Sequence, residues 1–221
     1  MYTLTKGQHD VLTSNKQCMI VRGDRRTGKS FTGQILVTTT LLSKAKSVAY
    51  IIVPTPRHGI NMIDDIVSMF KEDICTQSCI WKVNKQHRTI TFANYSEIII
   101  LTPTDILSYE FKGYQIPDLI FIDELDLFDK KVAKRIFAII KENYFSRNWN
   151  CRFFMDYTPT ISYYRCYLHK IMPKYIGVNS LWCEALFRLA GCNKNWYRTE
   201  FRQKEIQEVI ECTLDRKRAL L

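Results

Sequence analysis

The sequence predicts an α/β fold in which a mostly parallel β-sheet is flanked by helices. Short apolar runs rich in β-branched residues recur along the chain, as in strands that are buried on both faces. Segments with apolar residues at helical spacing separate these runs, and this alternation is typical of βαβ units. The predicted strands cover residues 18–21, 48–53, 98–101, 119–122 and 152–155.

Three helices are predicted between these strands, at 30–42, 60–70 and 132–140. Each range carries an apolar stripe with the period of an α-helix. One stretch departs from the alternation, because 81–83 and 89–92 look like the arms of an antiparallel hairpin closed by polar residues. We therefore expect a mixed sheet.

The composition is that of a folded protein with an excess of positive charge. The chain has 221 residues, a formal net charge of +10 and 46% hydrophobic residues, which excludes disordered and collagen-like chains. No apolar run approaches the roughly 18 to 20 residues that span a bilayer, and the N-terminus lacks the layout of a signal peptide. We expect a protein of a reducing interior with no membrane partner, and its scattered cysteines are expected to be thiols rather than zinc ligands.

Two domains are predicted, an α/β core at 1–160 and a smaller basic helical lid or linker at 161–221. The second range carries 11 Lys and Arg against 6 Asp and Glu, so its density of positive charge is more than twice that of the first. Its long helix is expected at 197–214. Charge of this kind fits a partner made of phosphates or an acidic surface.

A phosphate-binding loop is the strongest local signal. Residues 23–30, GDRRTGKS, fit G-x-x-x-x-G-K-[ST] and lie between a predicted strand and a predicted helix. In such a loop the backbone N–H groups and the positive end of the helix face the phosphates. Lys29 is expected to bridge the β- and γ-phosphates, and the Ser30 hydroxyl to hold Mg²⁺. The predicted nucleotide-binding residues of the loop are Gly23, Arg25, Arg26, Thr27, Gly28, Lys29 and Ser30.

Two carboxylates follow the predicted strand 119–122 and supply the second half of a triphosphate site. They lie at the carboxyl edge of the sheet, where open α/β folds bind ligands. Asp123 is the predicted metal residue, and Glu124 is placed to orient and deprotonate the attacking water. Thr158 follows another strand and precedes a proline. It is either a sensor of the γ-phosphate or an ordinary loop residue.

With these residues the sequence resembles the N-terminal ATPase domain of viral terminase large subunits, the DNA-packaging motors of tailed phages and their relatives. In that family's variant Walker A loop an Arg lies four residues before the Lys, and Arg25 holds that place. Tyr95 and Lys112 depart from the family's usual Gly and Arg. The other matching segments follow in the family's order within 1–160: Gln8 as the adenine-side glutamine, then 90–98, 111–114, 117–124 and 157–159.

The resemblance implies a RecA-like P-loop NTPase of the additional-strand class that uses ATP and Mg²⁺, with Arg25 as arginine finger and Arg26 as a competitor for that role. It also implies movement of double-stranded DNA by a homo-oligomeric ring. The implied partners are a portal, a small terminase subunit and a separate nuclease, beside a procapsid in the host cytoplasm or nucleus. No nuclease activity is expected in this chain, because 161–221 is too short for the family's nuclease domain.

Sequence-independent contacts to DNA phosphates are expected from basic side chains. The candidates are Lys82, Lys85, Arg88, Arg198, Arg202 and Lys204. Two alternatives to the packaging motor stay open. A superfamily 1 or 2 helicase core shares the order of glutamine, phosphate loop, Pro-Thr turn and Asp-Glu pair, but it needs a second RecA-like domain. The other alternative is a non-hydrolysing ATP-binding module, against which Glu124 argues.

Overall fold

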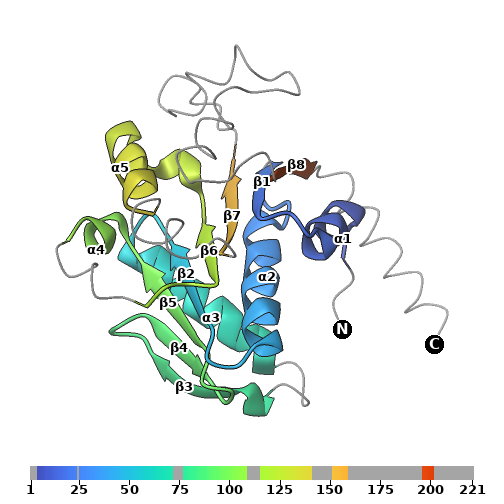
Figure 1. The fold of residues 1–221 in the computed structure, drawn as a ribbon, viewed down its shortest axis with the longest axis vertical. Helices are drawn as coiled ribbons and strands as arrows, with labels where there is room; N and C mark the ends of the chain where they lie inside the picture. Colours follow the sequence, from blue (N-terminus) through green and yellow to red (C-terminus); the bar gives the residue numbers. More distant parts are fainter. Residues whose placement is uncertain are drawn as a thin grey trace.

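An eight-stranded sheet with helices on both faces forms the centre of the protein (Figure 1). The structure is a computed structural model, and it describes residues 4–23, 25–71, 77–108, 115–140, 151–158 and 196–201. The strand order is β3-β4-β5-β2-β6-β7-β1-β8. The predicted α/β class with a mostly parallel sheet is confirmed.

Six neighbouring strands, from β5 to β8 in that order, run parallel to one another. Their carboxyl ends therefore meet at one edge of the sheet, where the predicted site residues follow β1, β6 and β7. Five of the six strands match predicted ranges to within two residues at each end. The six are β1 (Cys18–Gly23), β2 (Val48–Ile52), β5 (Glu97–Leu101), β6 (Leu119–Ile122), β7 (Arg152–Tyr157) and β8 (Trp196–Phe201).

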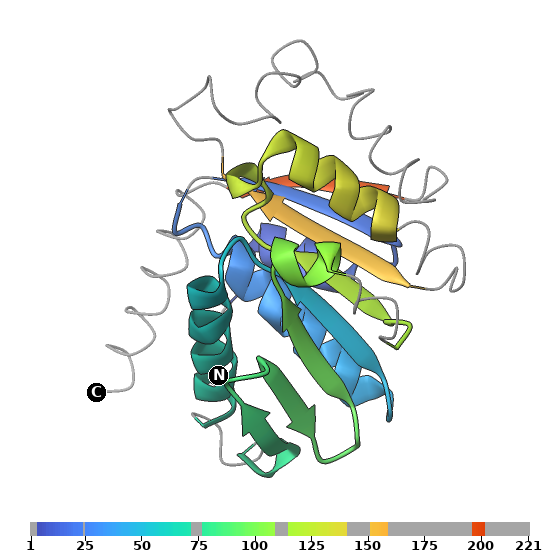
Figure 2. The ribbon, with the colours of Figure 1, turned by 90° about the vertical axis from the view of Figure 1, so that its left-hand side faces the viewer.

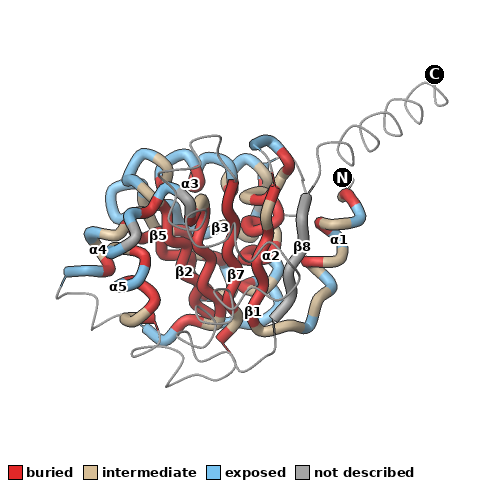
Figure 3. The backbone as a smooth tube through the Cα atoms, turned by 90° about the horizontal axis from the view of Figure 1, so that it is seen from above, coloured by how far each residue is buried: buried red, intermediate tan, exposed pale blue. Residues whose placement is uncertain are grey.

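Two apolar cores lie on opposite faces of the sheet, because successive strand residues point to opposite sides. In β1, Ile20 packs with the first core and Val21 with the second. Figure 2 shows the helical layers, and Figure 3 shows the buried strands at the centre of the molecule. Helices α4 (Pro103–Leu107) and α5 (Lys130–Ile140) cover the first core, and α1 (Lys6–Thr13), α2 (Lys29–Ser43) and α3 (Pro56–Lys71) cover the second.

The predicted hairpin is present and makes the sheet mixed. Strand β3 (Ile80–Asn84) pairs antiparallel with β4 (Thr89–Phe92), and β4 pairs antiparallel with β5. The pairing of β3 shifts register between Ile80 and Lys82. Two short 3-10 helices complete the described elements, η1 (Gln77–Cys79) before the hairpin and η3 (Leu125–Leu127) after β6.

Strand β8 corrects the sequence-based prediction for the C-terminal stretch. The helix expected at 197–214 is wrong over 197–201, because these residues pair in parallel with β1 along its whole length. Aromatic and β-branched residues dominate the segment WYRTEF, and these types favour strands. The rest of the predicted helix, and most of the predicted lid at 161–221, lie outside the described residues.

The cysteines do not all behave as predicted. Cys18 is disulfide-bonded, so the prediction that the cysteines are thiols is wrong for this residue. Cys79 and Cys151 carry free thiols, and burial raises the pKa of the Cys151 thiol. Among the described residues, no helix is both long and apolar enough to cross a membrane.

Candidate nucleotide-binding site

The loop between β1 and α2 has a backbone that only certain residues tolerate. Gly28 lies in the left-handed region with φ 77°, and it caps the N-terminus of α2. Its carbonyl accepts hydrogen bonds from the Thr32 N–H at 2.9 Å and from the Thr32 hydroxyl at 2.8 Å. A Cβ at Gly28 would lie 2.5 Å from Gln8 Nε2. Glycine therefore removes both a conformational penalty and a clash at this position.

Gln8 fixes the start of α1 to this loop. Its side-chain oxygen accepts from the Thr5 N–H at 2.8 Å, and its own N–H donates to the Thr5 hydroxyl at 3.2 Å, which completes a capping box. The side-chain Nε2 lies 3.5 Å from the Gly28 carbonyl. The structure thus places Gln8 against the phosphate loop, and its role toward adenine stays a prediction.

A cavity of about 600 Å³ opens at the loop. Its size suits a small-molecule ligand. Lys29 is buried to 6% exposure although it carries a charge, whereas Arg25 and Arg26 are exposed. The residues that line the cavity are Arg25, Arg26, Thr27, Gly28, Lys29, Ser30, Phe31, His58, Glu124, Leu127 and Thr158. The structure therefore brings all the predicted loop residues except Gly23 together with Glu124 and Thr158 around one space.

Two buried carboxylates at the ends of β6 and β7 contact Ser30, which lines this cavity. Asp123 is 5% exposed and Asp156 is fully buried. Burial raises the pKa of Asp123 to about 6, and a hydrogen bond with Ser30 opposes the rise. Burial and then the nearby Asp123 raise the pKa of Asp156 well above its usual value. The Ser30 hydroxyl also lies 3.5 Å from Asp156 Oδ2, so it sits between the two groups.

The donor set at this point fits a magnesium ion. The Oδ1 atom of Asp123 is buried without a hydrogen-bond partner, which is costly unless a cation or water satisfies it. Carboxylate and hydroxyl oxygens are hard ligands that Mg²⁺ accepts while it keeps several waters. Among the described residues, no group of three or more His, Cys, Asp or Glu side chains could hold a metal ion. Asp123 and Ser30 are the side chains whose oxygens suit the ion here.

Glu124 has a strained backbone that two neighbours support. Its φ of 49° lies in the left-handed region, which costs a non-glycine residue about 1 kcal/mol or more. Its N–H donates to Asp156 Oδ1 at 2.8 Å. Its carboxylate Oε2 lies 3.5 Å from His58 Nε2, which belongs to α3. Asp156 and His58 thus hold the backbone and the side chain of the predicted catalytic residue.

Asp156 and His58 were not predicted from the sequence. Asp156 had a usable signal, because it is an acidic residue enclosed by the apolar residues of β7, RFFMDY. His58 had none, since its position near Glu124 depends on how β2 and β6 pair. Asp156 lies at the end of β7 and His58 lies just after β2. Both reach the site because these two strands end at the same edge of the sheet.

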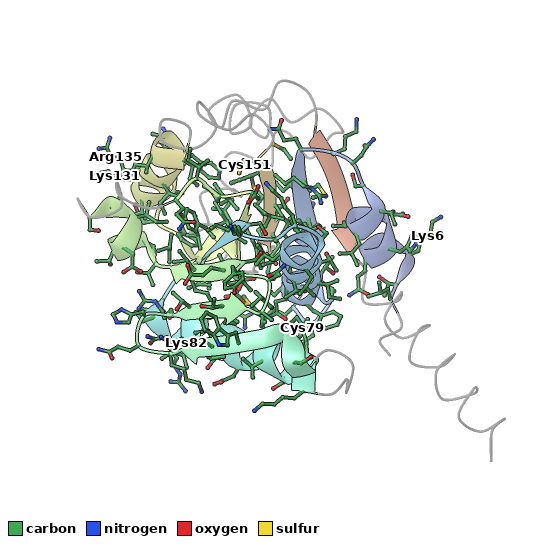
Figure 4. The ribbon with its side chains drawn as sticks, turned by 60° about the horizontal axis from the view of Figure 1, so that its bottom comes forward. Lys6, Cys79, Lys82, Lys131, Arg135 and Cys151 are labelled. Atoms are coloured by element: carbon green, nitrogen blue, oxygen red, sulfur yellow. The ribbon has the colours of Figure 1, made fainter. Side chains whose placement is uncertain are left out.

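The predicted DNA-contact residues of the hairpin differ in their surroundings. Arg88 donates to Asp105 Oδ2 at 2.6 Å and to the Ile100 carbonyl at 3.3 Å, so its guanidinium has a structural task. Lys85 pairs with Asp64 at 2.6 Å. Lys82 is exposed, far from the exposed Lys131 and Arg135 of α5 (Figure 4). Arg198 lies on β8, and Arg202 and Lys204 lie outside the described residues.

The fold, the phosphate loop and the Asp-Glu pair after β6 define a P-loop NTPase. The family model described as DEAD/DEAH box helicase matches residues 5–155. The chain therefore belongs to the DEAD/DEAH box helicase family. Comparison with curated proteins gives no match.

Solved structures with the same fold include terminases and a helicase-type protein. The large terminase of a thermophilic bacteriophage superposes with a TM-score of 0.65 at 16% identity, over 92% of this chain and 47% of that one. The ATPase domain of the Thermus phage P74-26 large terminase gives 0.64 at 12% identity, over 98% of this chain and 88% of that domain. A DEAD box protein of the hyperthermophile Methanococcus jannaschii gives 0.54 at 15% identity, over 89% and 48%.

These similarities confirm the predicted resemblance to terminase large subunits at the level of the fold. The chain spans about half the length of the thermophilic-phage terminase, 47% of it. That terminase has also been solved with ADP and with ATP-γ-S. The DEAD box protein has this fold too, and the family model that matches the chain is a helicase model, so both comparisons also fit the helicase-type alternative.

Proposed function

We propose that the protein is a Mg²⁺-dependent ATP hydrolase. One observation carries the proposal: Lys29 and Ser30 line the same cavity as Glu124, and Ser30 contacts the buried Asp123 and Asp156 behind it. Positive charge for phosphates, oxygen ligands for Mg²⁺ and a carboxylate for water are thus collected at one place. The complexes of the thermophilic-phage large terminase with ADP and ATP-γ-S support a nucleotide as the ligand.

Each residue of the site has a distinct part in this proposal. The phosphate-loop N–H groups and Lys29 bind the β- and γ-phosphates, and Asp123 with Ser30 holds the metal. Bound Mg²⁺ would neutralise charge on the phosphate oxygens. Glu124 orients a water molecule and takes its proton while the water oxygen bonds to the γ-phosphorus. The bond to the leaving oxygen of ADP breaks, and that oxygen keeps the electron pair.

The exposed arginines of the loop complete the electrostatic part of the site. Arg25 and Arg26 both line the cavity, so either guanidinium can reach a phosphate. Arg25 is the proposed arginine finger because it holds the position of the terminase arginine. Thr158 also lines the cavity and is 7% exposed, which suits a sensor of the γ-phosphate at the end of β7.

We extend the proposal to a motor that uses this hydrolysis to move double-stranded DNA without reading its sequence. The support is the overlap with the P74-26 large terminase ATPase domain, which extends over 98% of this chain. In this role the protein works as a homo-oligomeric ring beside a viral procapsid, with a portal, a small terminase subunit and a separate nuclease as partners. The exposed Lys82 is the hairpin residue best placed for DNA phosphates.

A helicase-type ATPase core is the second candidate, and the family match to residues 5–155 favours it. The two candidates predict different outcomes with the purified chain and Mg-ATP. A packaging motor has ATPase activity that double-stranded DNA stimulates, and it leaves duplexes intact. Stimulation by single strands together with strand separation would select the helicase-type core.

Substitution of Glu124 and Lys29 tests hydrolysis itself. Glu124→Gln should retain ATP binding and lose turnover by about 10²-fold or more, because it removes the base but keeps the shape. Lys29→Ala should weaken ATP binding. Unchanged turnover in both variants would refute the proposed enzyme and leave a nucleotide-binding module.

A further inference from the structure

His58 contacts the proposed catalytic carboxylate from the side of the site opposite the phosphate loop. The phosphate loop follows β1, whereas His58 follows β2, and β7 and β6 lie between these two strands. The His58 Nε2 atom is 3.5 Å from Glu124 Oε2. Both side chains line the cavity and are partly exposed, 42% for His58 and 33% for Glu124.

Thr55 determines which way the imidazole is turned. The Thr55 hydroxyl oxygen accepts the His58 N–H at 3.3 Å and lies 2.8 Å from His58 Nδ1. One hydroxyl group can accept the first bond and donate the second. The residue that precedes α3 therefore also orients the ring.

The three groups follow one another from the end of β2 to the end of β6. The Thr55 hydroxyl can donate to His58 Nδ1, and an ionised glutamate only accepts hydrogen bonds, so a hydrogen on Nε2 would face the Glu124 carboxylate. At 3.5 Å this last contact is an electrostatic approach rather than a formed hydrogen bond.

The backbone fixes the segments that carry His58 and Glu124 relative to each other. Strands β2 and β6 pair directly, with Ile52 opposite Ile122. Beyond that pair, the Asp123 N–H donates to the Ile52 carbonyl at 3.0 Å. The segment that carries His58 and the segment that carries Glu124 are thus fixed to each other by sheet hydrogen bonds.

We infer that His58, oriented by Thr55, is a positioning residue that holds one carboxylate oxygen of Glu124 and leaves the other directed at the attacking water. This inference rests on the proposed hydrolysis and adds a specific arrangement to it. A reaction slows when the catalytic carboxylate sits on a flexible side chain that can rotate away from the substrate. Groups that orient the ligands of a metal site are worth about 10- to 100-fold in metal affinity or activity, and we expect an effect of the same order for a group that orients Glu124.

The test is steady-state ATP hydrolysis by the full chain with His58→Ala, His58→Gln and the matched control His87→Ala. His87 is exposed in the turn of the hairpin. His58→Ala should lower kcat about 10- to 100-fold with KM for ATP within about twofold, since His58 is proposed to act on the orientation of Glu124 and not to bind ATP. His58→Gln retains an N–H donor and should recover most of kcat. His87→Ala should match the wild type.

Two further variants keep the inference open to refutation. Thr55→Ser retains the hydroxyl and should behave as wild type, whereas Thr55→Val should resemble His58→Ala in kcat. In the Glu124→Gln background, His58→Ala should have no additional effect, because it acts only through Glu124. A kcat for His58→Ala within twofold of wild type, or above it, overturns the inference.

The result for Glu124→Gln separates the two proposals. If Glu124→Gln loses turnover while His58→Ala retains it, the positioning role fails and the hydrolase stands. If Glu124→Gln itself retains full turnover, the proposed hydrolase fails. Thermal unfolding of each variant accompanies the assays, so that a loss of kcat without a shift in Tm reports on the site.

Discussion

Gly33 gives the most direct test of how the phosphate-loop helix α2 is seated on the sheet. A Cβ at this position would lie 2.5, 2.6 and 2.9 Å from three ring atoms of Phe121 in β6. Phe121 cannot yield freely, because it is fully buried and packs against Phe154 with ring centroids 5.1 Å apart. Gly33→Ala must therefore move the helix away from the sheet or displace the ring.

Two opposing effects decide the size of the change in stability. Alanine gains about 1 kcal/mol over glycine in a helix interior. Overpacking by one methyl group costs about 1 to 3 kcal/mol, and three contacts below 3.0 Å place this case at the upper end. The net loss is about 2 kcal/mol, which for a chain of this size lowers Tm by roughly 4 to 8 °C.

The assay is thermal unfolding of Gly33→Ala beside the matched control Gly59→Ala. A Cβ at Gly59 in α3 meets its nearest atoms at 3.1, 3.2 and 3.5 Å. These contacts need shifts of only a few tenths of an ångström, so any loss in Tm should be well below that of Gly33→Ala. Phe121→Leu combined with Gly33→Ala should recover part of the loss. Hydrolysis should fall more than stability suggests, because α2 carries Lys29 and Ser30 and a shift of about 1 Å can cost about 10²-fold in rate. A Tm for Gly33→Ala equal to or above wild type would refute the packing argument.

Three other predictions concern the site and its supports. In the absence of Mg²⁺, the free energy of unfolding should fall by about 2 to 3 kcal/mol as the pH rises from about 4 to about 6. The pKa of Asp123 is raised to about 6, so in this range the folded state holds a proton that the unfolded state has lost. Urea titrations across this range test the sign. Asp123→Asn should make the slope shallower, although the raised pKa of Asp156 contributes in the same direction. Stability that rises with pH in this range contradicts the prediction. Gly28→Ala should cost about 1 to 2 kcal/mol of stability and weaken ATP binding, because its φ of 77° is unfavourable for alanine. Adding Gln8→Ala should relieve only the clash with the Gln8 side chain. Full recovery of stability in this double variant would disprove the backbone argument. Asp105→Ala should destabilise the chain by about 2 kcal/mol in chemical denaturation, since Asp105 Oδ2 accepts from Arg88 and from both the N–H and hydroxyl of Thr102. The control Asp10→Ala should be neutral, because Asp10 is partly exposed and its one recorded contact is a 3.9 Å approach to His9.

Local sequence was sufficient to predict the phosphate loop. The positions of Gly28 and Lys29 are set by a strand, a tight left-handed turn and a helix that follow one another without interruption. The same holds for Asp123 and Glu124, which come directly after the four buried residues of β6. Such features need only neighbouring residues, so their pattern is visible before the fold is known.

Contacts between segments that are distant in the sequence could not be predicted from local sequence patterns. The strand β8 forms because the edge of β1 is available to it, and the sequence around Tyr197 did not reveal that partner. The position of Arg88 likewise depends on Asp105, which lies 17 residues further along the chain. Pairing partners of this kind are chosen by the whole sheet rather than by local propensity.

The sequence by itself determined the residues that the proposed chemistry needs: a loop for phosphates, a hydroxyl and a carboxylate for Mg²⁺, and a carboxylate for water. The tertiary structure alone decided which side chains control that chemistry. Parallel pairing of β2, β6, β7 and β1 brings the ends of four separate strands to one edge, and so Asp156 and His58 meet Glu124 there. The physical reason is that the buried carboxylate of Asp156 and the partly exposed carboxylate of Glu124 both need partners, and only the folded sheet supplies them.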